Sequence, residues 1–187
     1  EEIKLMCAVI CDGSFYYNKN SEEMVHRNSY NTCRFHIKKD RKKIALRKLF
    51  EDGNFEYREK ESMEKGYTDF YVSAPRREKE FTSYWYDCSN EQLQIICDNL
   101  IQWDGSVDYT KNGIKRNRFS TSIKQTADFV QFAYSSCGYK TSISTKNRIG
   151  REKINKNNGK SYFDKSIEYT LNISKRNLIS LATKYDK

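Results

Sequence analysis

Two aspartates occupy equivalent places in two similar stretches of the chain. Asp12 lies in MCAVICDGSFYY, residues 6–17, and Asp104 lies in DNLIQWDGSVDY, residues 98–109. A carboxylate is a hard oxygen ligand that suits Mg²⁺, and divalent cations assist the hydrolysis of phosphodiesters. A single Asp-Gly step is typical of a turn or a helix end. Two copies separated by about half the chain favour a functional pair.

Each aspartate ends an apolar stretch of helical length. The apolar residues are Leu5, Met6, Val9 and Ile10 before Asp12, and Leu93, Ile96, Leu100 and Ile101 before Asp104. The second helix is expected to begin at Ser89 or Asn90, because both residue types commonly cap helices. A carboxylate at a helix C-terminus opposes the helix dipole, and two such carboxylates repel each other. We therefore expect positive charge to compensate the two aspartates.

Similar β-like and helical runs follow both aspartates. After a short β-like run at each Gly-Ser step, the expected strands are 32–38, 55–59 and 67–73, then 118–124, 140–145 and 167–173. Helices are expected over 42–50 and over 126–137, the second ending at Gly138. The tail over 175–184 is compatible with a short closing helix. The pattern predicts an α+β fold of two pseudo-symmetric αββαββ repeats, residues 1–88 and 89–187.

Two Asp-Gly steps at the ends of two apolar helices, in a basic and repeated α+β chain, resemble the LAGLIDADG homing endonucleases. The resemblance covers nearly the whole chain. It implies a curved antiparallel β-saddle that cups the DNA major groove, with the two motif helices packed at the centre. It also implies that Asp12 and Asp104, with Gly13 and Gly105 beside them, form the metal site. Asn99 and Trp103 depart from the family pattern, which usually has small residues where the helices approach.

Members of this family also place basic side chains near the scissile phosphates. The resemblance assigns this catalytic role to Lys175, which follows the last expected strand, and to Arg76 as its first-half counterpart. Lys38 and Lys124, at the ends of the second strands, are further candidates for positioning water or phosphate. An ordinary solvated lysine is the alternative interpretation for each of these positions.

The outward residues of the expected strands are polar and suit base recognition, because Arg and Lys bond guanine edges and hydroxyl groups adapt to several bases. The expected base-facing residues are Arg34, His36, Lys38, Arg118, Ser120, Ser122 and Lys124, with Tyr16 and Tyr109 as weaker candidates. A basic loop over 146–160 is expected to contact phosphates through Lys146, Arg148, Arg151, Lys153 and Lys156. A solvated sheet face would also be polar, so this assignment competes with a structural one.

Charge and composition agree with a polyanionic partner. The chain has 34 Lys+Arg against 25 Asp+Glu, a formal net charge of +9. Residues 1–104 hold 17 basic and 19 acidic side chains, whereas residues 105–187 hold 17 and 6, so the second half is expected to supply most of the phosphate affinity. The longest apolar runs are far shorter than a bilayer span. The six cysteines show no C-x-x-C pair, which favours reduced thiols in an intracellular protein of the cytoplasm, nucleoid or organelle matrix.

These features together predict a monomeric, Mg²⁺-dependent endonuclease in which Mn²⁺ can substitute. It would cut double-stranded DNA at a long asymmetric site and leave 3′ overhangs, with no small-molecule cofactor and no membrane partner. The start at Glu1 favours an intein-embedded or intron-encoded domain. One alternative is a non-catalytic nucleic-acid-binding protein of the same fold, such as an intron maturase acting on RNA. A second alternative is an unrelated basic domain with an accidental repeat, in which Asp12 and Asp104 would lie far apart.

Overall fold

The chain divides into two compact units. The computed structural model describes residues 1–15, 30–64, 66–109, 115–154, 159 and 161–175. The first unit comprises residues 1–81 and 94–104, and the second comprises residues 82–93 and 105–187. Most of the second motif helix thus belongs with the first unit. In the described part of the chain, no helix is both long enough and apolar enough to span a membrane.

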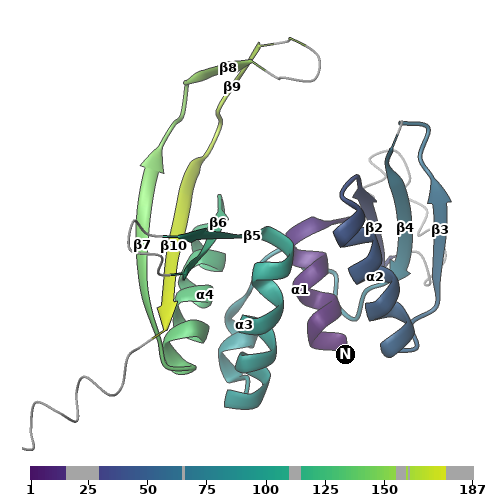
Figure 1. The fold of residues 1–187 in the computed structure, drawn as a ribbon, viewed down its shortest axis with the longest axis horizontal. Helices are drawn as coiled ribbons and strands as arrows, with labels where there is room; N and C mark the ends of the chain where they lie inside the picture. The colour runs from purple at the N-terminus through teal and green to yellow at the C-terminus, as the bar shows by residue number, and fades with distance from the viewer. Residues whose placement is uncertain (16–29, 65, 110–114, 155–158, 160, 176–187) are drawn as a thin grey trace, which may run out of the picture. The chain divides into compact units, whose positions relative to one another are not determined.

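The first unit consists of a four-stranded antiparallel sheet and the helices that cover one of its faces (Figure 1). In chain order its elements are α1 (Glu2–Asp12), β1 (Gly13–Phe15), β2 (Thr32–Ile37), α2 (Asp40–Asp52), β3 (Tyr57–Glu61) and β4 (Thr68–Ser73). The strands lie in the order β1-β2-β4-β3, and α1 and α2 both contact β2.

Alternation along β2 determines which face of this sheet is buried. Cys33, Phe35 and Ile37 are buried under the helices, whereas Arg34 and His36 point to the other face and are half-buried. The expected alternation of β2 is therefore confirmed. Helix α2 presents Leu46, Leu49 and Phe50 to the core, while Ile44 lies on its outer side and is 63% exposed.

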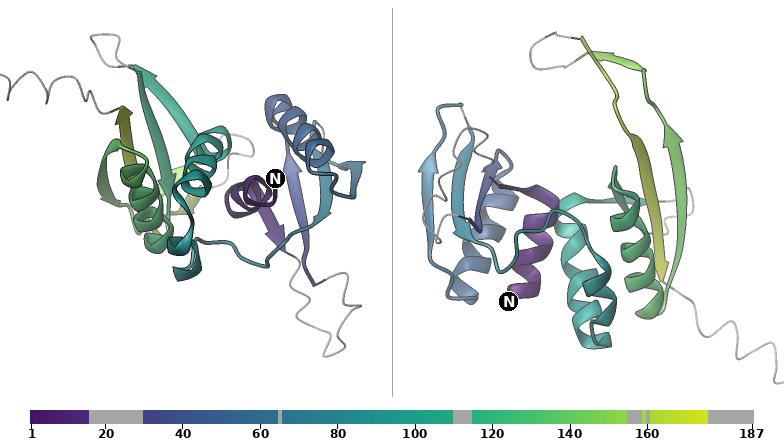
Figure 2. Two further views of the ribbon diagram at one scale, coloured as in Figure 1. Left: turned by 90° about the horizontal axis from the view of Figure 1, so that it is seen from below. Right: turned by 180° about the vertical axis from the view of Figure 1, so that it is seen from behind.

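The second unit repeats the same order of elements. It contains the 3₁₀ turn η1 (Ser83–Asp87), the first turn of α3 (Asn90–Asp104), β5 (Gly105–Tyr109), β6 (Lys115–Thr121), α4 (Lys124–Ser136), β7 (Tyr139–Asn147), β8 (Glu152–Ile154), β9 (Ser161–Phe163) and β10 (Ile167–Lys175). The sheet order β5-β6-β10-β7 matches that of the first unit element by element. Helix α4 covers one sheet face, and β7 and β10 lead into the β8–β9 hairpin (Figure 2). The predicted α+β fold of two αββαββ repeats is confirmed, with β8 and β9 inserted into the second.

Three local expectations of the second half change. The strand expected over 118–124 is β6, which ends at Thr121, because the Thr121 hydroxyl accepts a hydrogen bond from the Ile123 amide and turns the chain. Ser122 and Lys124 are therefore not strand residues, and Lys124 opens α4. The segment 146–160, expected to be a loop, instead contributes the end of β7 and the strand β8.

Both expected helix signals of the second half are confirmed. Ser89 caps α3 through a reciprocal capping box with Gln92, in which the Gln92 amide donates to the Ser89 hydroxyl and the Gln92 side chain accepts from the Ser89 amide. After α4, Gly138 has a left-handed φ of +82° and its amide donates to the Ser135 carbonyl. The closing helix expected over 175–184 lies outside the described residues beyond Lys175.

Gly13 is required by close packing rather than by a left-handed backbone. Its φ of −73° and ψ of 161° are extended values that any residue can adopt. A Cβ at this position would lie 2.4 Å from the Cys33 sulfur and 2.8 Å from the Val9 carbonyl oxygen. The glycine after Asp12 therefore lets the end of α1 run directly against β2.

We expect Gly13→Ala to lower the free energy of unfolding by about 1–3 kcal/mol, the usual cost of forcing extra atoms into a packed interior. Cys33→Ala removes one of the two clashing atoms, so Gly13→Ala should cost less in that background. Urea denaturation of the four proteins in this cycle measures both values. An equal cost in the two backgrounds would contradict the assigned contact with Cys33.

Candidate functional site

The carboxylates of Asp12 and Asp104 converge on one cation. The ammonium of Lys42, in the first turns of α2, lies 2.5 Å from Asp12 Oδ2 and 3.8 Å from Asp104 Oδ1. The thiol of Cys11 also hydrogen bonds to the Asp104 carboxylate. All four side chains belong to the first unit. The alternative in which the repeat is accidental required the two aspartates to be far apart, and this proximity contradicts it.

Two further basic side chains satisfy the carbonyl groups at the ends of the motif helices. Lys79 Nζ lies 2.5 Å from the Val9 carbonyl oxygen and 2.7 Å from that of Ile10, at the end of α1. Arg41 Nη1 donates to the Gln102 carbonyl at 2.7 Å, at the end of α3. Cations at helix C-termini stabilise the negative end of the dipole. The expected compensation is thus provided by Lys42, Lys79 and Arg41.

Burial and mutual repulsion shift the protonation equilibria of this site. Burial and the neighbouring Asp12 charge raise the pKa of Asp104 above its ordinary value, against the opposing effect of Lys42 and Lys79. Burial also raises the pKa of the Cys11 thiol well above its usual value, so Cys11 is a neutral donor. Burial lowers the pKa of Lys79 from its ordinary value, and nearby acidic groups partly offset this.

The donor set fits a hard divalent cation. Asp12 and Asp104 both reach a single positive centre, and their side chains keep 19% and 37% of their surface exposed. Among the described residues, no group of three or more His, Cys, Asp or Glu side chains could hold a metal ion. Mg²⁺ is commonly held by only one or two carboxylates, with water and phosphate oxygens completing its shell. Two aspartates are therefore a sufficient protein contribution.

The four predicted basic catalytic residues have different surroundings. Arg76 forms an ion pair with Glu78, at 2.9 Å, and the Lys38 ammonium lies 5.4 Å from the centre of the Tyr67 ring. Lys124 lies in α4 and forms an exposed ion pair with Asp128, so its expected place at a strand end is wrong. Lys175, expected to follow the last strand, is instead the last residue of β10. Lys124 and Lys175 belong to the second unit.

In the first sheet, the predicted base-facing residues gather around a buried acid that sequence analysis missed. Arg34 donates to Asp69 through Nε at 3.0 Å and Nη2 at 2.9 Å, and His36 Nδ1 lies 2.7 Å from Asp69 Oδ1. Asp69 is 6% exposed. Burial alone would raise the pKa of Asp69, but the hydrogen bonds from His36 and Arg34 outweigh burial and lower it. The carboxylate therefore stays ionised and fixes the Arg34 guanidinium.

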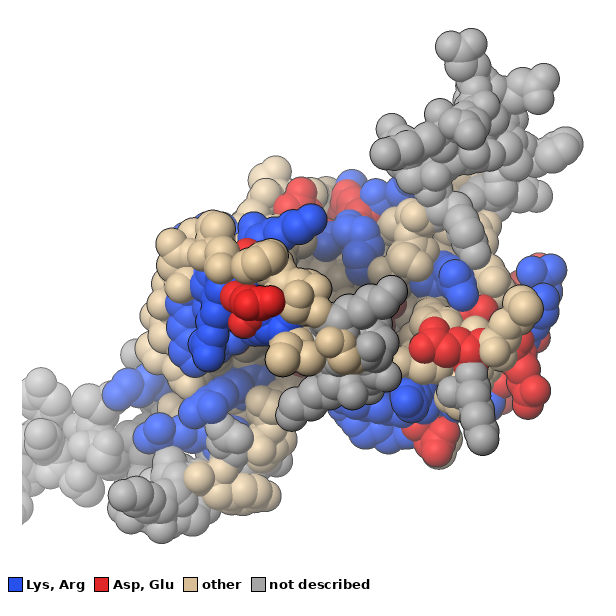
Figure 3. Space-filling view, turned by 90° about the horizontal axis from the view of Figure 1, so that it is seen from above, with Lys and Arg blue, Asp and Glu red and all other residues tan. Residues whose placement is uncertain are grey.

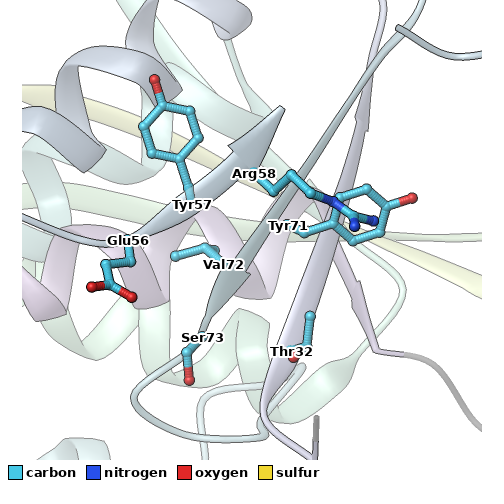
Figure 4. Close-up of a pocket in the computed structure, with 7 residues that line it drawn as sticks. All are labelled: Thr32, Glu56, Tyr57, Arg58, Tyr71, Val72 and Ser73. Carbon is cyan, nitrogen blue, oxygen red and sulfur yellow. The ribbon is translucent and has the colours of Figure 1, made fainter. Parts of the chain in front are cut away.

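The same sheet face continues across β4 and β3 into an open groove. Figure 4 shows the Arg58 side chain over the ring of Tyr71, and the guanidinium carbon lies 5.0 Å from the ring centre. Thr32 and Ser73 lie opposite each other in the β2–β4 ladder and line the same groove. A stacked arginine beside two hydroxyl groups is chemically suited to a nucleic-acid surface. Sequence analysis did not select these residues, although the strand alternation places Arg58 and Tyr71 in register with Arg34.

The second sheet presents small hydroxyl and amide groups on the corresponding face. Arg118 Nε donates to Asn172 Oδ1 at 3.2 Å, and the hydroxyls of Ser120 and Thr170 lie 3.1 Å apart. Tyr109, at the end of β5, is 70% exposed. Arg118 and Ser120 thus occupy the expected strand face, and Ser122 lies beyond the strand.

Four of the basic residues expected to contact phosphate lie in β7, in β8 or in the segment that joins these strands: Lys146, Arg148, Arg151 and Lys153. Lys146 and Arg151 are exposed, whereas Arg148 and Lys153 form ion pairs with Glu168 and Asp164 at 2.8 and 2.6 Å. Figure 3 shows one face of the molecule, on which blue basic areas are interspersed with red acidic ones. The predictions for Tyr16 and Lys156 fall outside the described residues.

Comparison with known proteins identifies the architecture. No family model matches the chain, and no curated protein does. A structure of mesophilic variants of the homing endonuclease I-DmoI matches 97% of this chain and 92% of its own, with 16% identity and a TM-score of 0.53. The N-terminal LAGLIDADG domain of DUF199/WhiA matches 97% of this chain and 77% of its own, with 8% identity and a TM-score of 0.51. The chain has the LAGLIDADG fold.

The structures that share the LAGLIDADG fold include a homing endonuclease and DUF199/WhiA. The fold alone therefore does not establish the activity of this chain. I-DmoI has been solved in complex with DNA and Mn and in complex with DNA and Ca. In the present chain, Asp12 and Asp104 end α1 and α3 and so terminate the two motif helices. Trp103, which stands at a usual small-residue position, is 3% exposed and is accommodated within the fold.

The raised pKa of Asp104 predicts that its ionised carboxylate lowers the stability of the fold. A raised pKa means that the folded state favours the protonated acid. The ionised carboxylate therefore lowers the free energy of unfolding at pH values above the raised pKa. This loss is absent below the ordinary pKa of 3.8, where the acid is protonated in both the folded and the unfolded state. Asp104→Asn should therefore raise Tm at pH 7 by about 1–2 °C, a small effect because the side chain is more than a third exposed. The gain should vanish near pH 3. Melting in metal-free buffer, with the exposed Asp98→Asn as control, measures it, and a lower Tm at pH 7 would contradict the assignment.

Proposed function

We propose that this protein is a sequence-specific endonuclease that hydrolyses phosphodiester bonds of double-stranded DNA with Mg²⁺ or Mn²⁺. The observation that carries the proposal is that Asp12 and Asp104, at the ends of two apolar helices, both converge on the Lys42 ammonium. The fold is that of an endonuclease solved with DNA, and the second half of the chain is strongly basic. We further propose a long asymmetric target, 3′ overhangs and action as a monomer, within an intron- or intein-encoded element inside the cell.

The chain's own residues would orient the reaction. A bound divalent cation would supply Lewis-acid stabilisation of the attacking and leaving oxygens. Asp12 and Asp104 would hold that cation, with the backbone at Gly13 and Gly105 beside them. Lys79 and Arg41 donate hydrogen bonds to backbone carbonyl groups at the helix ends that carry the aspartates. Lys175, Arg76, Lys38 and Lys124 remain candidates for contacting the phosphates, and Lys175 is the first to test.

The sheet faces would recognise the duplex in two different ways. In the first unit, Arg34 is fixed by Asp69 and Arg58 is stacked on Tyr71, so both present a defined orientation. An arginine held in place by a carboxylate is suited to bidentate contact with a guanine edge. In the second unit, Ser120 and Thr170 offer hydroxyl groups that can donate or accept, and such groups adapt to several bases.

Cleavage can be tested without knowing the target. The Asp12→Asn variant is used to select binding sites from a pool of duplexes with a randomised central segment. Wild-type protein should then cut the selected duplexes in Mg²⁺ or Mn²⁺, whereas Asp12→Asn and Asp104→Asn should be slower by roughly 10²–10³-fold. Gel analysis of both labelled strands measures the rates and the overhang.

Three results would overturn parts of this proposal. Wild-type protein that binds the selected duplexes but leaves them intact in both metals would favour the non-catalytic binder. Equal cleavage by the variants and the wild type would remove Asp12 and Asp104 from the site. Enrichment from a matched RNA pool instead of the DNA pool would favour the maturase alternative.

The charge distribution predicts where phosphate affinity resides. Lys140 and Lys146 are exposed and pair across the ladder with Ser174 and Glu168, on the same sheet face as Ser120. Replacing both lysines by Ala should reduce the slope of log affinity against log salt by about 1.8, because each phosphate contact contributes about 0.9. Lys48→Ala, an exposed lysine of α2, should leave the slope unchanged. An equal slope change in the Lys48 variant would contradict a phosphate surface on the second sheet.

A further inference from the structure

Lys42 is a buried lysine whose position no sequence motif accounts for. It is 7% exposed and lies on the face of α2 that also carries Leu46 and Leu49. Lysine is rarely buried to this degree unless its charge is paired. Here the ammonium lies 2.5 Å from Asp12 Oδ2 and 3.8 Å from Asp104 Oδ1. The buried charge is therefore matched by the two carboxylates of the proposed metal site.

The ammonium lies where it opposes binding of another cation. Asp12 Oδ2 already receives its hydrogen bond, and a Mg²⁺ ion bound to that oxygen would need to approach to about 2.1 Å. Two cations bound to one carboxylate oxygen repel each other strongly in a partly buried site. Lys42 and a divalent cation thus compete for the same carboxylate, unlike Lys79, which is bonded to the α1 carbonyls.

We propose that Lys42 is a built-in counter-cation that holds Asp12 and Asp104 together before metal binds, and that a divalent cation must displace the Lys42 ammonium from Asp12. The inference rests on the proposed function for the metal site at Asp12 and Asp104. Lys42 therefore has two effects of opposite sign. It stabilises the metal-free protein by offsetting the repulsion between two carboxylates, and it weakens metal binding because its removal from Asp12 costs free energy.

Metal binding to purified variants tests the competition without any DNA. Calorimetric titration with MnCl₂ should show at least tenfold tighter binding to Lys42→Met than to wild type, whereas Lys42→Arg keeps the charge and should stay within a few-fold of wild type. The metal-free Tm should fall in Lys42→Met, and saturating Mn²⁺ should raise it more than it raises that of wild type. Lys43→Met is a matched control, since the Lys43 ammonium pairs with Asp40 on the same helix.

A second measurement on the wild-type protein covers the case in which Lys42→Met does not fold. The ¹⁵Nζ resonance of Lys42, assigned by its loss in Lys42→Arg, should be that of a paired ammonium in metal-free protein. Titration with diamagnetic Mg²⁺ should shift this resonance or broaden it by solvent exchange. A resonance that is unchanged at saturating Mg²⁺ would overturn the proposal.

The outcomes separate this inference from the nuclease proposal. Equal or weaker Mn²⁺ binding by Lys42→Met overturns the competition even if the wild-type protein cuts DNA. Tighter binding by Lys42→Met supports the competition even if no duplex is cut. Absence of Mn²⁺ binding to both proteins at millimolar concentration also overturns it, because Lys42 would then have no competitor.

Discussion

Two like charges at the negative ends of two helix dipoles are the constraint around which this site is built. Asp12 and Asp104 would each destabilise their own helix end, and their proximity adds mutual repulsion. Three basic side chains offset this negative charge. Lys42 lies between the carboxylates, Lys79 binds the α1 carbonyls and Arg41 binds an α3 carbonyl. The raised pKa of Asp104 shows that these cations do not fully offset burial and repulsion. A divalent cation bound at the pair, as proposed above, would relieve this remaining repulsion.

The position of α2 determines how this compensation is achieved. Helix α2 begins at Asp40, so Arg41 and Lys42 both lie in its first turn. From this one turn, Arg41 reaches the Gln102 carbonyl and Lys42 reaches Asp12. A change in the start of α2 would therefore disturb both helix ends together. The close approach of Gly13 to Cys33 has a similar consequence, because it fixes the end of α1 against β2.

Sequence analysis could predict the elements and the acids, because both depend on local patterns. Three local signals were confirmed: each Asp-Gly-Ser marks the end of a helix, β2 alternates between buried and half-buried residues, and Ser89 caps α3. The partners of the acids depend on tertiary contacts. Lys42 lies 30 positions from Asp12, and Lys79 lies about 70 positions from the carbonyls that it binds. One local signal for Lys42 did exist, since it continues the i, i+4, i+7 stripe of Leu46 and Leu49, where an apolar residue is expected.

The two sheet faces show why net charge is an incomplete guide to binding. The first half has a slight acidic excess, yet one of its acids, Asp69, is buried and directs Arg34 and His36 instead of repelling a polyanion. An ionised acid bonded in this way leaves the cation in place but fixes its direction, which favours selectivity over affinity. The second half carries exposed lysines on the sheet face, which favour affinity over selectivity. In the proposed DNA complex, this charge imbalance would divide the work between two sheets of the same topology, with orientation supplied by the first and attraction by the second.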